Sequence, residues 1–580
     1  MTGLSTSSIS PLLTAAFVAT FAAIATSSFR KWMKSKKPYA YIPGPTPSTV
    51  VAHSYAGYLL DLHSPDALPW HFNVPEEYGH VARLKGGLAG ADALYITDPA
   101  ALNAILIRQQ AWFPESTEFA GYEETYVLLY SESDAVQRLF GIIHCGDGVA
   151  SVQGLEHKKQ RKYMDALFTA NRVSKLTPMF YQVAHQLEDK LKAAVSDTPG
   201  KVVDMLDCLT RAALEIIGTA GIGHTFNSFD DKSEAFDEFH GAITSVLPLA
   251  SRLFLVLPFL ESWRKMKPVW LRRTLAYVGT LPWPSARKFR AAVDAMHPVY
   301  VNLYKARQRM LEEGGSAALA DTAAGGKDLI TSMIQANWDA DETHKMSEDT
   351  VLANMGSIVH GGQETTSSSL ARFLTIIAED QDLQVRLREE LRDAKAKKAP
   401  GEDLDYTELE KLPLLDAVVR EMMRIYSPVT FVWRQTTKDV VVPLTYPIRS
   451  IMNGEETKEL LIHQGTAVYL GMSAANRSTA IWGADAAQFK PERWLNRTQG
   501  ESKLPGAYSG MMTFLSGAKV CPGKTFALLE MKLVLAVLLL SFSFEPIPTP
   551  IDWRMGITLE PRVRGREKEG AQVPVRVTAL

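Results

Sequence analysis

Cysteine is scarce in this chain: 580 residues contain only three, Cys145, Cys208 and Cys521. An odd and small number cannot cross-link a chain of this length, which argues against a disulfide-stabilised secreted protein and favours folding in a reducing compartment. The chain also has little net charge, because its 62 Lys and Arg residues nearly balance its 64 Asp and Glu residues, for a net charge of −2. Without a strong positive field, we expect no nucleic-acid binding.

Internal repeats, long low-complexity linkers and a second long apolar run are absent as well. Hydrophobic residues make up 46% and charged residues 22%, as in ordinary globular proteins. Helical periodicity dominates residues 154–195, 347–380, 414–425 and the stretch after 523, whereas strand-like runs such as 439–444 and 465–470 are short. The sequence predicts a mainly α fold with small β-sheets, in which residues 51–580 form one large domain, with a flexible loop at 314–326.

Residues 9–29 carry no charge, and at helical rise they would cover about 30 Å of hydrocarbon. Lys and Arg are absent before this run and crowd directly behind it, from Arg30 to Lys37. This order favours an uncleaved membrane anchor over residues 1–37 with the rest of the chain in the cytoplasm. A signal peptide cleaved after Ala25 is the alternative, but it would need positive charge before the apolar run. Proline-rich residues 38–50 are predicted to form a stiff spacer.

A single cysteine stands at the start of a predicted helix. The segment from Phe514 to Gly523 reads FLSGAKVCPG and precedes a long apolar helical run. A helix amino terminus lowers the pKa of a thiol, so Cys521 is expected to favour its thiolate form. Gly517 and Gly523 can take positive φ and let a flat ligand approach the backbone. Alone, a cysteine among apolar residues is more often an inert core side chain than a reactive one.

A second unusual segment, HGGQETTS from His360 to Ser367, lies in the middle of the long helix predicted at 347–380. Two glycines cost a helix about 2 kcal/mol relative to alanine, so they are expected to make room for something. One possibility is a ligand that meets a hydroxyl and an acid here, and the other is a close helix crossing.

The pattern Phe-x-x-Gly-x-Lys-x-Cys-x-Gly resembles the haem-ligand signature of the cytochrome P-450 monooxygenases. The resemblance implies haem b with Cys521 as the proximal iron ligand, and a haem-binding loop that includes Phe514, Gly517, Lys519 and Gly523. The family usually has Arg where this chain has Lys519, which can still neutralise a haem propionate as a point charge.

The GGQETT segment resembles the family's oxygen-side motif. By that resemblance Thr365 stabilises reduced oxygen at the iron, and Glu364 relays protons from solvent. His360, where relatives often carry an apolar residue, is either a structural side chain or a hydrogen-bond partner of the substrate.

Three further motifs resemble parts of the family pattern. Glu421 and Arg424 match Glu-x-x-Arg, and Arg493 in FKPERW is implied to close a structural network with them. The resemblance also implies that three bases bind the haem carboxylates: His157, Arg161 and Arg434.

The resemblance therefore implies a haem-thiolate monooxygenase of the fungal microsomal type, which inserts one atom of O2 into a hydrophobic small molecule. Terpenoids, steroids, fatty acids and aromatic xenobiotics remain open as substrates, in fungal secondary metabolism or detoxification. The expected location is the endoplasmic reticulum membrane, single-pass, with a cytosolic catalytic domain. By placement, the substrate pocket is expected to include Val359, His360, Val429 and Phe431.

The stretch after Cys521 is too short for flavin and nicotinamide domains, so electrons are expected from a separate NADPH-dependent flavin reductase, docked near Lys524 and Lys532. Two other functions stay open at this point. One is a haem-thiolate isomerase or dehydratase that uses no O2, which the Glu364 and Thr365 pair argues against. The other is a non-catalytic haem sensor.

Overall fold

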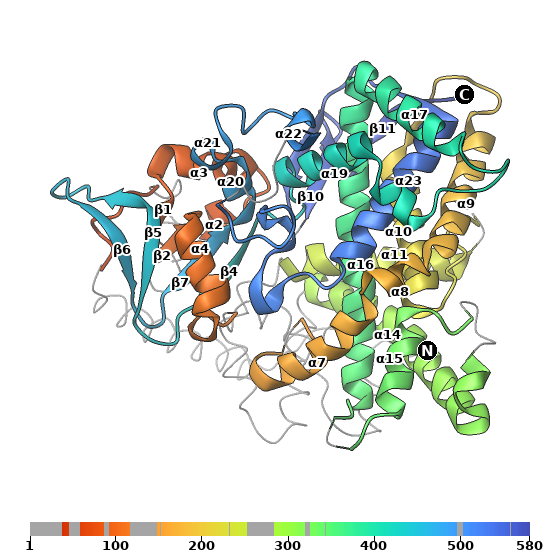
Figure 1. The fold of residues 1–580 in the computed structure, drawn as a ribbon, viewed down its shortest axis with the longest axis horizontal. Coiled ribbons are helices and arrows are strands. Elements are labelled where there is room, and N and C mark those ends of the chain that lie inside the picture. The colour runs from red at the N-terminus through yellow and green to blue at the C-terminus, as the bar shows by residue number, and fades with distance from the viewer. Residues whose placement is uncertain are drawn as a thin grey trace, which may run out of the picture.

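The computed structural model describes residues 38–45, 59–85, 92–115, 148–150, 152–230, 233–251, 284–319, 325–342, 344–495, 503–556 and 558–580. Most of these residues are helical (Figure 1). The helical elements, with η marking 3-10 and π segments, are α2 (Leu59–Leu62), α3 (Leu68–Tyr78), α4 (Pro99–Asn103), η2 (Ala104–Arg108), η3 (Gln110–Trp112), α7 (Gly154–Leu167), α8 (Ala170–Ser174), α9 (Thr177–Val195), α10 (Met205–Ile216), η5 (Ile217–Ile222), α11 (Glu234–Ser251), α14 (Pro284–Ala318), α15 (Leu329–Trp338), α16 (Glu348–Glu379), α17 (Gln381–Lys395), α18 (Tyr406–Glu410), α19 (Pro413–Ile425), α20 (Met472–Arg477), α21 (Thr479–Trp482), α22 (Glu492–Leu495), η8 (Met512–Phe514), η9 (Gly517–Lys519), α23 (Lys524–Ser541) and η10 (Glu567–Glu569).

The strands are short and form small sheets. They are β1 (Val81–Lys85), β2 (Asp92–Ile96), β3 (Lys201–Asp204), β4 (Phe431–Gln435), β5 (Val440–Arg449), β6 (Glu456–Ile462), β7 (Ala467–Gly471), β8 (Phe542–Pro546), β9 (Ile551–Met555), β10 (Leu559–Val563) and β11 (Pro574–Ala579). The largest sheet has the order β1-β2-β7-β4, with β2 and β7 parallel and the other neighbours antiparallel. A second sheet has the order β3-β11-β8, and β5–β6 and β9–β10 are antiparallel hairpins. The prediction of a mainly α fold with small sheets is confirmed.

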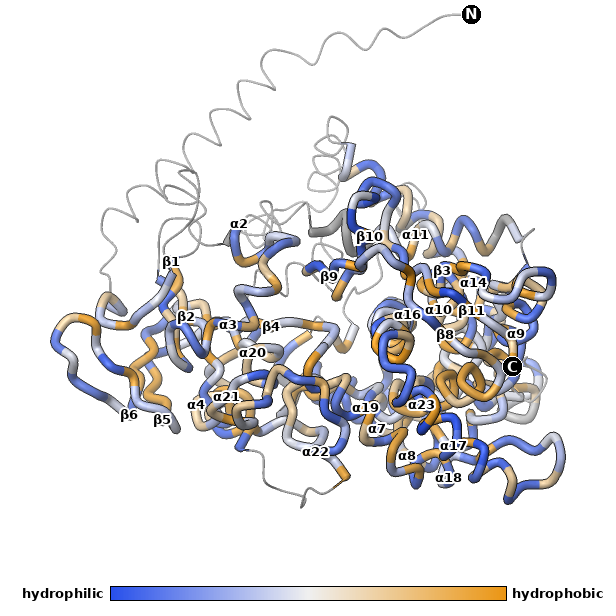
Figure 2. The backbone as a smooth tube through the Cα atoms, turned by 90° about the horizontal axis from the view of Figure 1, so that it is seen from above, coloured by the Kyte–Doolittle hydropathy of each residue, from blue (hydrophilic) through white to orange (hydrophobic). Residues whose placement is uncertain are grey.

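Helix α16 runs through the centre of the helical part, beside α23 and α10, while the β1-β2-β7-β4 sheet lies at the other end of the molecule (Figures 1 and 2). Its start is encoded locally, because the Ser347 side chain accepts a hydrogen bond from the Thr350 N–H, and Glu348 and Asp349 face the positive end of the helix dipole. Most of its residues are buried, so neighbouring elements cover it on nearly all sides. The helix predicted at 347–380 is confirmed to within one residue at each end.

Residues 38–45 pack onto the domain. Tyr39 and Ile42 are fully buried, and the Tyr39 hydroxyl bonds to Thr466 Oγ1 at 3.0 Å. A Cβ on Gly44 would lie 1.9 Å from the Arg83 carbonyl oxygen, so only glycine fits there. This half of the predicted spacer is therefore part of the domain, because its two large apolar side chains are buried by the core.

The predicted membrane span at residues 9–29 lies outside the described residues. Within the described ranges, no helix has the length and apolar character that crossing a bilayer requires. Within the predicted loop at 314–326, the helical backbone of α14 breaks at Gly315, which has φ 60° and ψ −161°, and a short helical segment then continues to Ala318.

Candidate active site

The segment from Phe514 to Cys521 folds back on itself just before α23. The Cys521 N–H donates to the Phe514 carbonyl at 3.0 Å, and the Phe514 ring is buried edge-on against Tyr508. Gly517 has φ +71°, and a Cβ there would lie 1.8 Å from the Leu106 carbonyl oxygen of η2. Glycine is thus required at Gly517 both by its backbone conformation and by this close approach.

Gly523 differs from the sequence-based expectation. Its φ is −77°, and a Cβ would lie no closer than 3.9 Å to Phe168 and 4.0 Å to the Cys521 sulfur. Neither backbone conformation nor crowding requires glycine at this position in the structure described.

Cys521 keeps an accessible face, although protein atoms surround it closely. This burial raises the pKa of the thiol, while the N–H groups of Gly523 and Lys524 and the positive charges of Arg161 and Lys524 oppose the rise. The expected net lowering of the pKa at the helix start is therefore wrong for the free thiol, because burial outweighs the helix terminus.

The predicted haem-carboxylate bases gather next to this loop. Arg161 donates to the Val520 carbonyl at 2.6 Å, directly beside Cys521. His157 is buried on the same helix, α7, and burial together with the nearby charges of Lys519 and Arg161 lowers its pKa to about 4. His157 is therefore neutral at pH 7 and can offer one N–H to a carboxylate.

A carboxylate that the sequence analysis missed, Glu115, joins the remaining two bases. Its Oε2 lies 2.7 Å from Lys519 Nζ, and its Oε1 lies 3.6 Å from an Arg434 guanidinium nitrogen. All three side chains are mostly buried. Lys519 also donates to the carbonyls of Ala150 and Val152 at 3.1 Å. The charge at Lys519 is thus already matched within the protein.

On α16, the two glycines have different surroundings. A Cβ on Gly361 would meet nothing within 4 Å, whereas one on Gly362 would lie 2.8 Å from Ile217 of η5. Each of the two explanations left open for this segment therefore fits one glycine: Gly362 allows a close helix contact, and Gly361 leaves open space for a ligand. The Thr365 hydroxyl donates to the Gly361 carbonyl at 2.7 Å, one turn back along the helix.

Glu364 contacts a second residue that the sequence analysis missed, Thr558 in the turn between β9 and β10. The Thr558 hydroxyl donates to Glu364 Oε1 at 2.9 Å. Burial raises the pKa of Glu364 to about 7, the Thr558 hydrogen bond lowers it, and the negative charge of Glu560 raises it. Glu364 is therefore poised to gain or lose a proton near neutral pH.

Glu421, Arg424 and Arg493 lie together in the interior. The Arg424 guanidinium donates two hydrogen bonds of 2.9 and 2.7 Å to the Glu421 carboxylate, and the Arg493 Nε lies 3.4 Å from Glu421 Oε1. Arg424 also donates to the carbonyls of Asn476 and Ala486 at 2.7 Å. The Trp494 indole and the Lys490 N–H also donate to the Glu421 carboxylate, at 2.8 and 3.1 Å. This network ties α19 to the chain that leads toward the Cys521 loop.

The four predicted substrate-pocket residues do not share one environment. Val359 is completely buried in the main core. Phe431 belongs to a smaller core, where its ring stacks on His71 at 4.9 Å. Both are core side chains in this structure, and their place in a substrate pocket stays a prediction. His360 and Val429 stay partly accessible, and burial lowers the pKa of His360 to about 4, so its ring is neutral.

Lys532 is also corrected, because it is buried rather than displayed for docking. Its Nζ lies 2.8 Å from Glu410 Oε1 and 2.8 Å from Asp416 Oδ1, and the side chain is 1% exposed. Lys524, eight residues earlier on α23, is partly accessible and donates to the Ala507 carbonyl at 3.3 Å.

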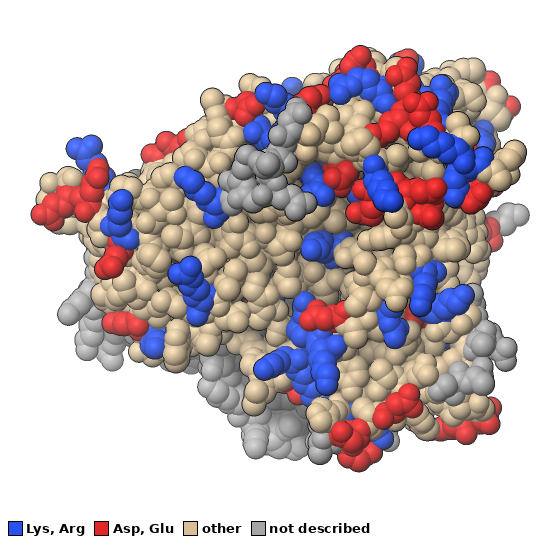
Figure 3. Space-filling model, in the orientation of Figure 1, with Lys and Arg blue, Asp and Glu red and all other residues tan. Residues whose placement is uncertain are grey.

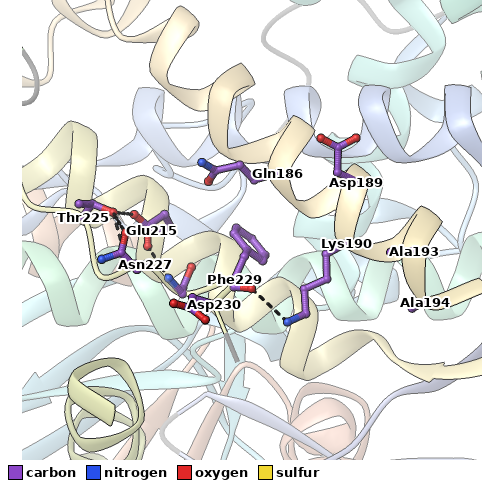
Figure 4. Close-up of a pocket in the computed structure, with 11 residues that line it drawn as sticks. Gln186, Asp189, Lys190, Ala193, Ala194, Glu215, Thr225, Asn227, Phe229 and Asp230 are labelled. Atoms are coloured by element: carbon purple, nitrogen blue, oxygen red, sulfur yellow. Dashed lines mark hydrogen bonds between the residues drawn. The ribbon is translucent and has the colours of Figure 1, made fainter. Parts of the chain in front are cut away.

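A groove of about 650 Å³ lies apart from these residues, between α9 and the segment after η5 (Figure 4). Its polar groups bind one another: Glu215 accepts from the Thr225 hydroxyl at 2.5 Å and from the Ser228 N–H at 3.0 Å, and Lys190 donates to the Phe229 carbonyl. No predicted site residue lines it.

Comparison with known proteins decides the family. A family model described as cytochrome P-450 matches residues 47–562. The chain belongs to the cytochrome P-450 family. Cytochrome P-450 monooxygenase 91 of Postia placenta is 35% identical over 93% of this chain and 94% of its own length. The ganoderic acid synthetase of Ganoderma lucidum is 30% identical over 94% of this chain and 95% of its own length.

Cytochrome P-450 monooxygenases hold haem through a cysteine thiolate, and the residues of this P-450 fit that group. Cys521 offers the sulfur, its accessible face lies at the start of α23, and the positive charges of Arg161 and Lys524 stand near it. Lys519 and Arg434, which share Glu115 in this structure, can supply further positive charge for the haem carboxylates. The fungal relatives bear out the resemblance given by the FLSGAKVCPG and GGQETT segments.

Proposed function

We propose that this P-450 inserts one oxygen atom from O2 into a hydrophobic small molecule and releases the other as water. The observation that carries the proposal is the accessible Cys521 at the start of α23, with the positive charges of Arg161 and Lys524 near it. The reaction consumes two electrons and two protons per O2. We propose that the electrons come from a separate NADPH-dependent flavin reductase.

When bound through Cys521, haem b supplies the redox chemistry that cleaves O2. Arg161, Lys519 and Arg434 would hold its carboxylates, and His157 would add one hydrogen bond from a neutral ring. Glu364, with its pKa near 7, can deliver protons from solvent one at a time, and the Thr365 hydroxyl stands one residue further along the same helix. These roles match what the family motifs imply.

We propose that the reductase docks over α7, because Lys532 is buried and cannot belong to a docking surface. Exposed Lys158 and Lys162 lie on the same helix as Arg161, which touches the residue before Cys521. Lysine and arginine side chains gather over this part of the surface (Figure 3). Such a patch attracts an acidic partner and shortens the electron path to the thiolate.

We propose a hydrophobic substrate of the terpenoid, steroid, fatty acid or aromatic xenobiotic class, in fungal secondary metabolism or detoxification. Similarity to a ganoderic acid synthetase supports a role in the synthesis of a secondary metabolite. We also propose a single-pass anchor at residues 1–37 in the endoplasmic reticulum membrane, with the catalytic domain in the cytosol.

The test is turnover of a panel of apolar compounds with a fungal reductase, NADPH and isotopically labelled O2. One labelled oxygen atom in each product, with none from labelled water, supports the proposal. Product that forms without O2 contradicts it. The Cys521→Ser variant should lose both the carbon monoxide difference band of the reduced haem-thiolate and all turnover.

For docking, the double variant Lys158→Glu, Lys162→Glu should slow reduction by the reductase about tenfold and flatten its salt dependence. Lys458→Glu, an exposed lysine on β6, is the matched control and should leave reduction unchanged. Equal rates for the two variants would contradict docking over α7.

A further inference from the structure

The β9–β10 hairpin is tied to α16 by two hydroxyl groups. The Thr558 hydroxyl donates to Glu364 Oε1 at 2.9 Å, and the Ser368 hydroxyl donates to the Leu559 carbonyl at 2.7 Å. Thr558 and Ser368 are 6% and 5% exposed, so both bonds are shielded from water. The Gly556 N–H donates to the Thr558 carbonyl at 3.0 Å, which fixes the turn that presents the Thr558 hydroxyl.

We propose that Thr558 is a positioning residue for proton delivery: its hydroxyl holds the Glu364 carboxyl group in the orientation from which Glu364 passes protons into the active site. This inference rests on the proposed role of Glu364. Thr558 lies 194 residues from Glu364 in the sequence, and no motif of the chain points to it.

A hydroxyl suits this task better than a charged partner. It can donate to the ionised carboxylate and, after rotation, accept from the protonated acid. Glu364 must pass through both forms, because it loses one proton toward the active site and regains one from solvent in each delivery. A lysine or arginine at this place would favour the carboxylate alone and oppose reprotonation.

The charged groups near Glu364 do not replace the Thr558 hydroxyl as the partner that orients its carboxyl group. The negative charge of Glu560 on β10 raises the pKa of Glu364, and the Arg562 guanidinium hydrogen-bonds to the Glu560 carboxylate. His360, one turn earlier on α16, has its pKa lowered to about 4 by burial and is neutral at working pH. Because the Thr558 hydrogen bond lowers the pKa of Glu364 from an otherwise higher value, its loss should shift that pKa upward.

The experiment compares three variants of the full-length, haem-loaded enzyme. Thr558→Val keeps the shape and removes the hydroxyl, and Thr558→Ser keeps the hydroxyl. Ser368→Ala is the matched control, because it removes the other hydroxyl tie between hairpin and helix without touching Glu364. The carboxyl stretch of Glu364, assigned by its loss in Glu364→Gln, is titrated by infrared difference spectroscopy. Hydrogen peroxide release per NADPH consumed measures proton delivery during turnover.

Thr558→Val should raise the pKa of Glu364 by roughly one unit and increase peroxide release several-fold, whereas Thr558→Ser and Ser368→Ala should resemble the wild type. If Thr558→Val and Ser368→Ala give the same Glu364 pKa and the same peroxide release, the inference is overturned, while the role of Glu364 is unaffected. Wild-type peroxide release in Glu364→Gln overturns the role of Glu364 and the inference together.

Discussion

The buried cation Lys532 offers a sharp test of the fold, because sequence reasoning placed it on a docking surface. Replacing Lys532 by Met keeps an unbranched side chain of similar length and removes the positive charge between Glu410 and Asp416. Both carboxylates lie 2.8 Å from its Nζ. The substitution therefore leaves two negative charges near each other with one partner fewer.

Removing one member of a buried ion pair costs about 3–5 kcal/mol. The lower end applies here, because Glu410 is 36% exposed and Asp416 keeps its contact with Arg420 at 2.5 Å. An unfolding entropy near 2 cal/mol/K per residue gives a chain of this size roughly 1 kcal/mol/K, so a loss of about 3 kcal/mol lowers the Tm by about 3 °C.

The assay is thermal unfolding of the haem-loaded protein, followed by its Soret absorbance, together with the rate of reduction by the reductase below the transition. Lys524→Met on the same helix is the control. Its amine makes one hydrogen bond to a carbonyl, so its stability should change by no more than about 0.5 kcal/mol. A Lys532→Met protein that melts with the wild type but is reduced more slowly would refute the burial of Lys532.

Three further predictions concern the active-site residues. Gly517→Ala should lose more than about 3 kcal/mol of stability and most of its bound haem, because of its positive φ and the Leu106 carbonyl at 1.8 Å, whereas Gly523→Ala should keep wild-type haem content; equal haem content in both would contradict the loop geometry. Glu115→Gln should slow haem transfer to an apoprotein acceptor several-fold, since it frees Lys519, which now lies 2.7 Å from that carboxylate; faster transfer would contradict this. Burial holds the pKa of Glu364 at about 7 instead of 4.5, so the folded state binds this proton more tightly than the unfolded state and the stabilisation is lost as the pH rises through that window. The unfolding free energy of Glu364→Gln, measured relative to the wild type by thermal unfolding, should therefore rise by up to about 3 kcal/mol from mildly acidic to mildly alkaline pH. A difference between the two proteins that does not change with pH would contradict this prediction.

The parts of the fold that sequence could predict are those encoded by short-range patterns. Helix α16 was predictable because a capping serine, acidic first-turn residues and a sustained apolar period all lie within one continuous segment. Strand β7 was found for the same reason, and the predicted strand at 439–444 is the first half of β5. The loop predicted at 314–326 was right in part, because the helix breaks at Gly315, whereas composition alone could not show that helical backbone resumes up to Ala318.

Polar residues show where local patterns lose their power. The spacing of Glu421 and Arg424 on one helix face reveals their pairing, but nothing near Lys532 in the sequence reveals Glu410 and Asp416. A lysine in an amphipathic sequence is normally a surface residue. Only the fold can show that two carboxylates more than 100 residues away in the sequence offset the cost of burying its charge.

The same distinction applies to the chemistry of the site. A motif identifies a reactive group such as Glu364, yet its pKa depends on burial and on a hydroxyl that the chain supplies from 194 residues away. Likewise Lys519 stands in the haem signature, while the carboxylate that competes for its charge, Glu115, comes from a distant segment. The motif therefore determines which reaction class is possible, and the distant partners determine how readily protons and haem carboxylates are bound. Differences among family members that share these motifs should accordingly be sought at positions such as Thr558 and Glu115.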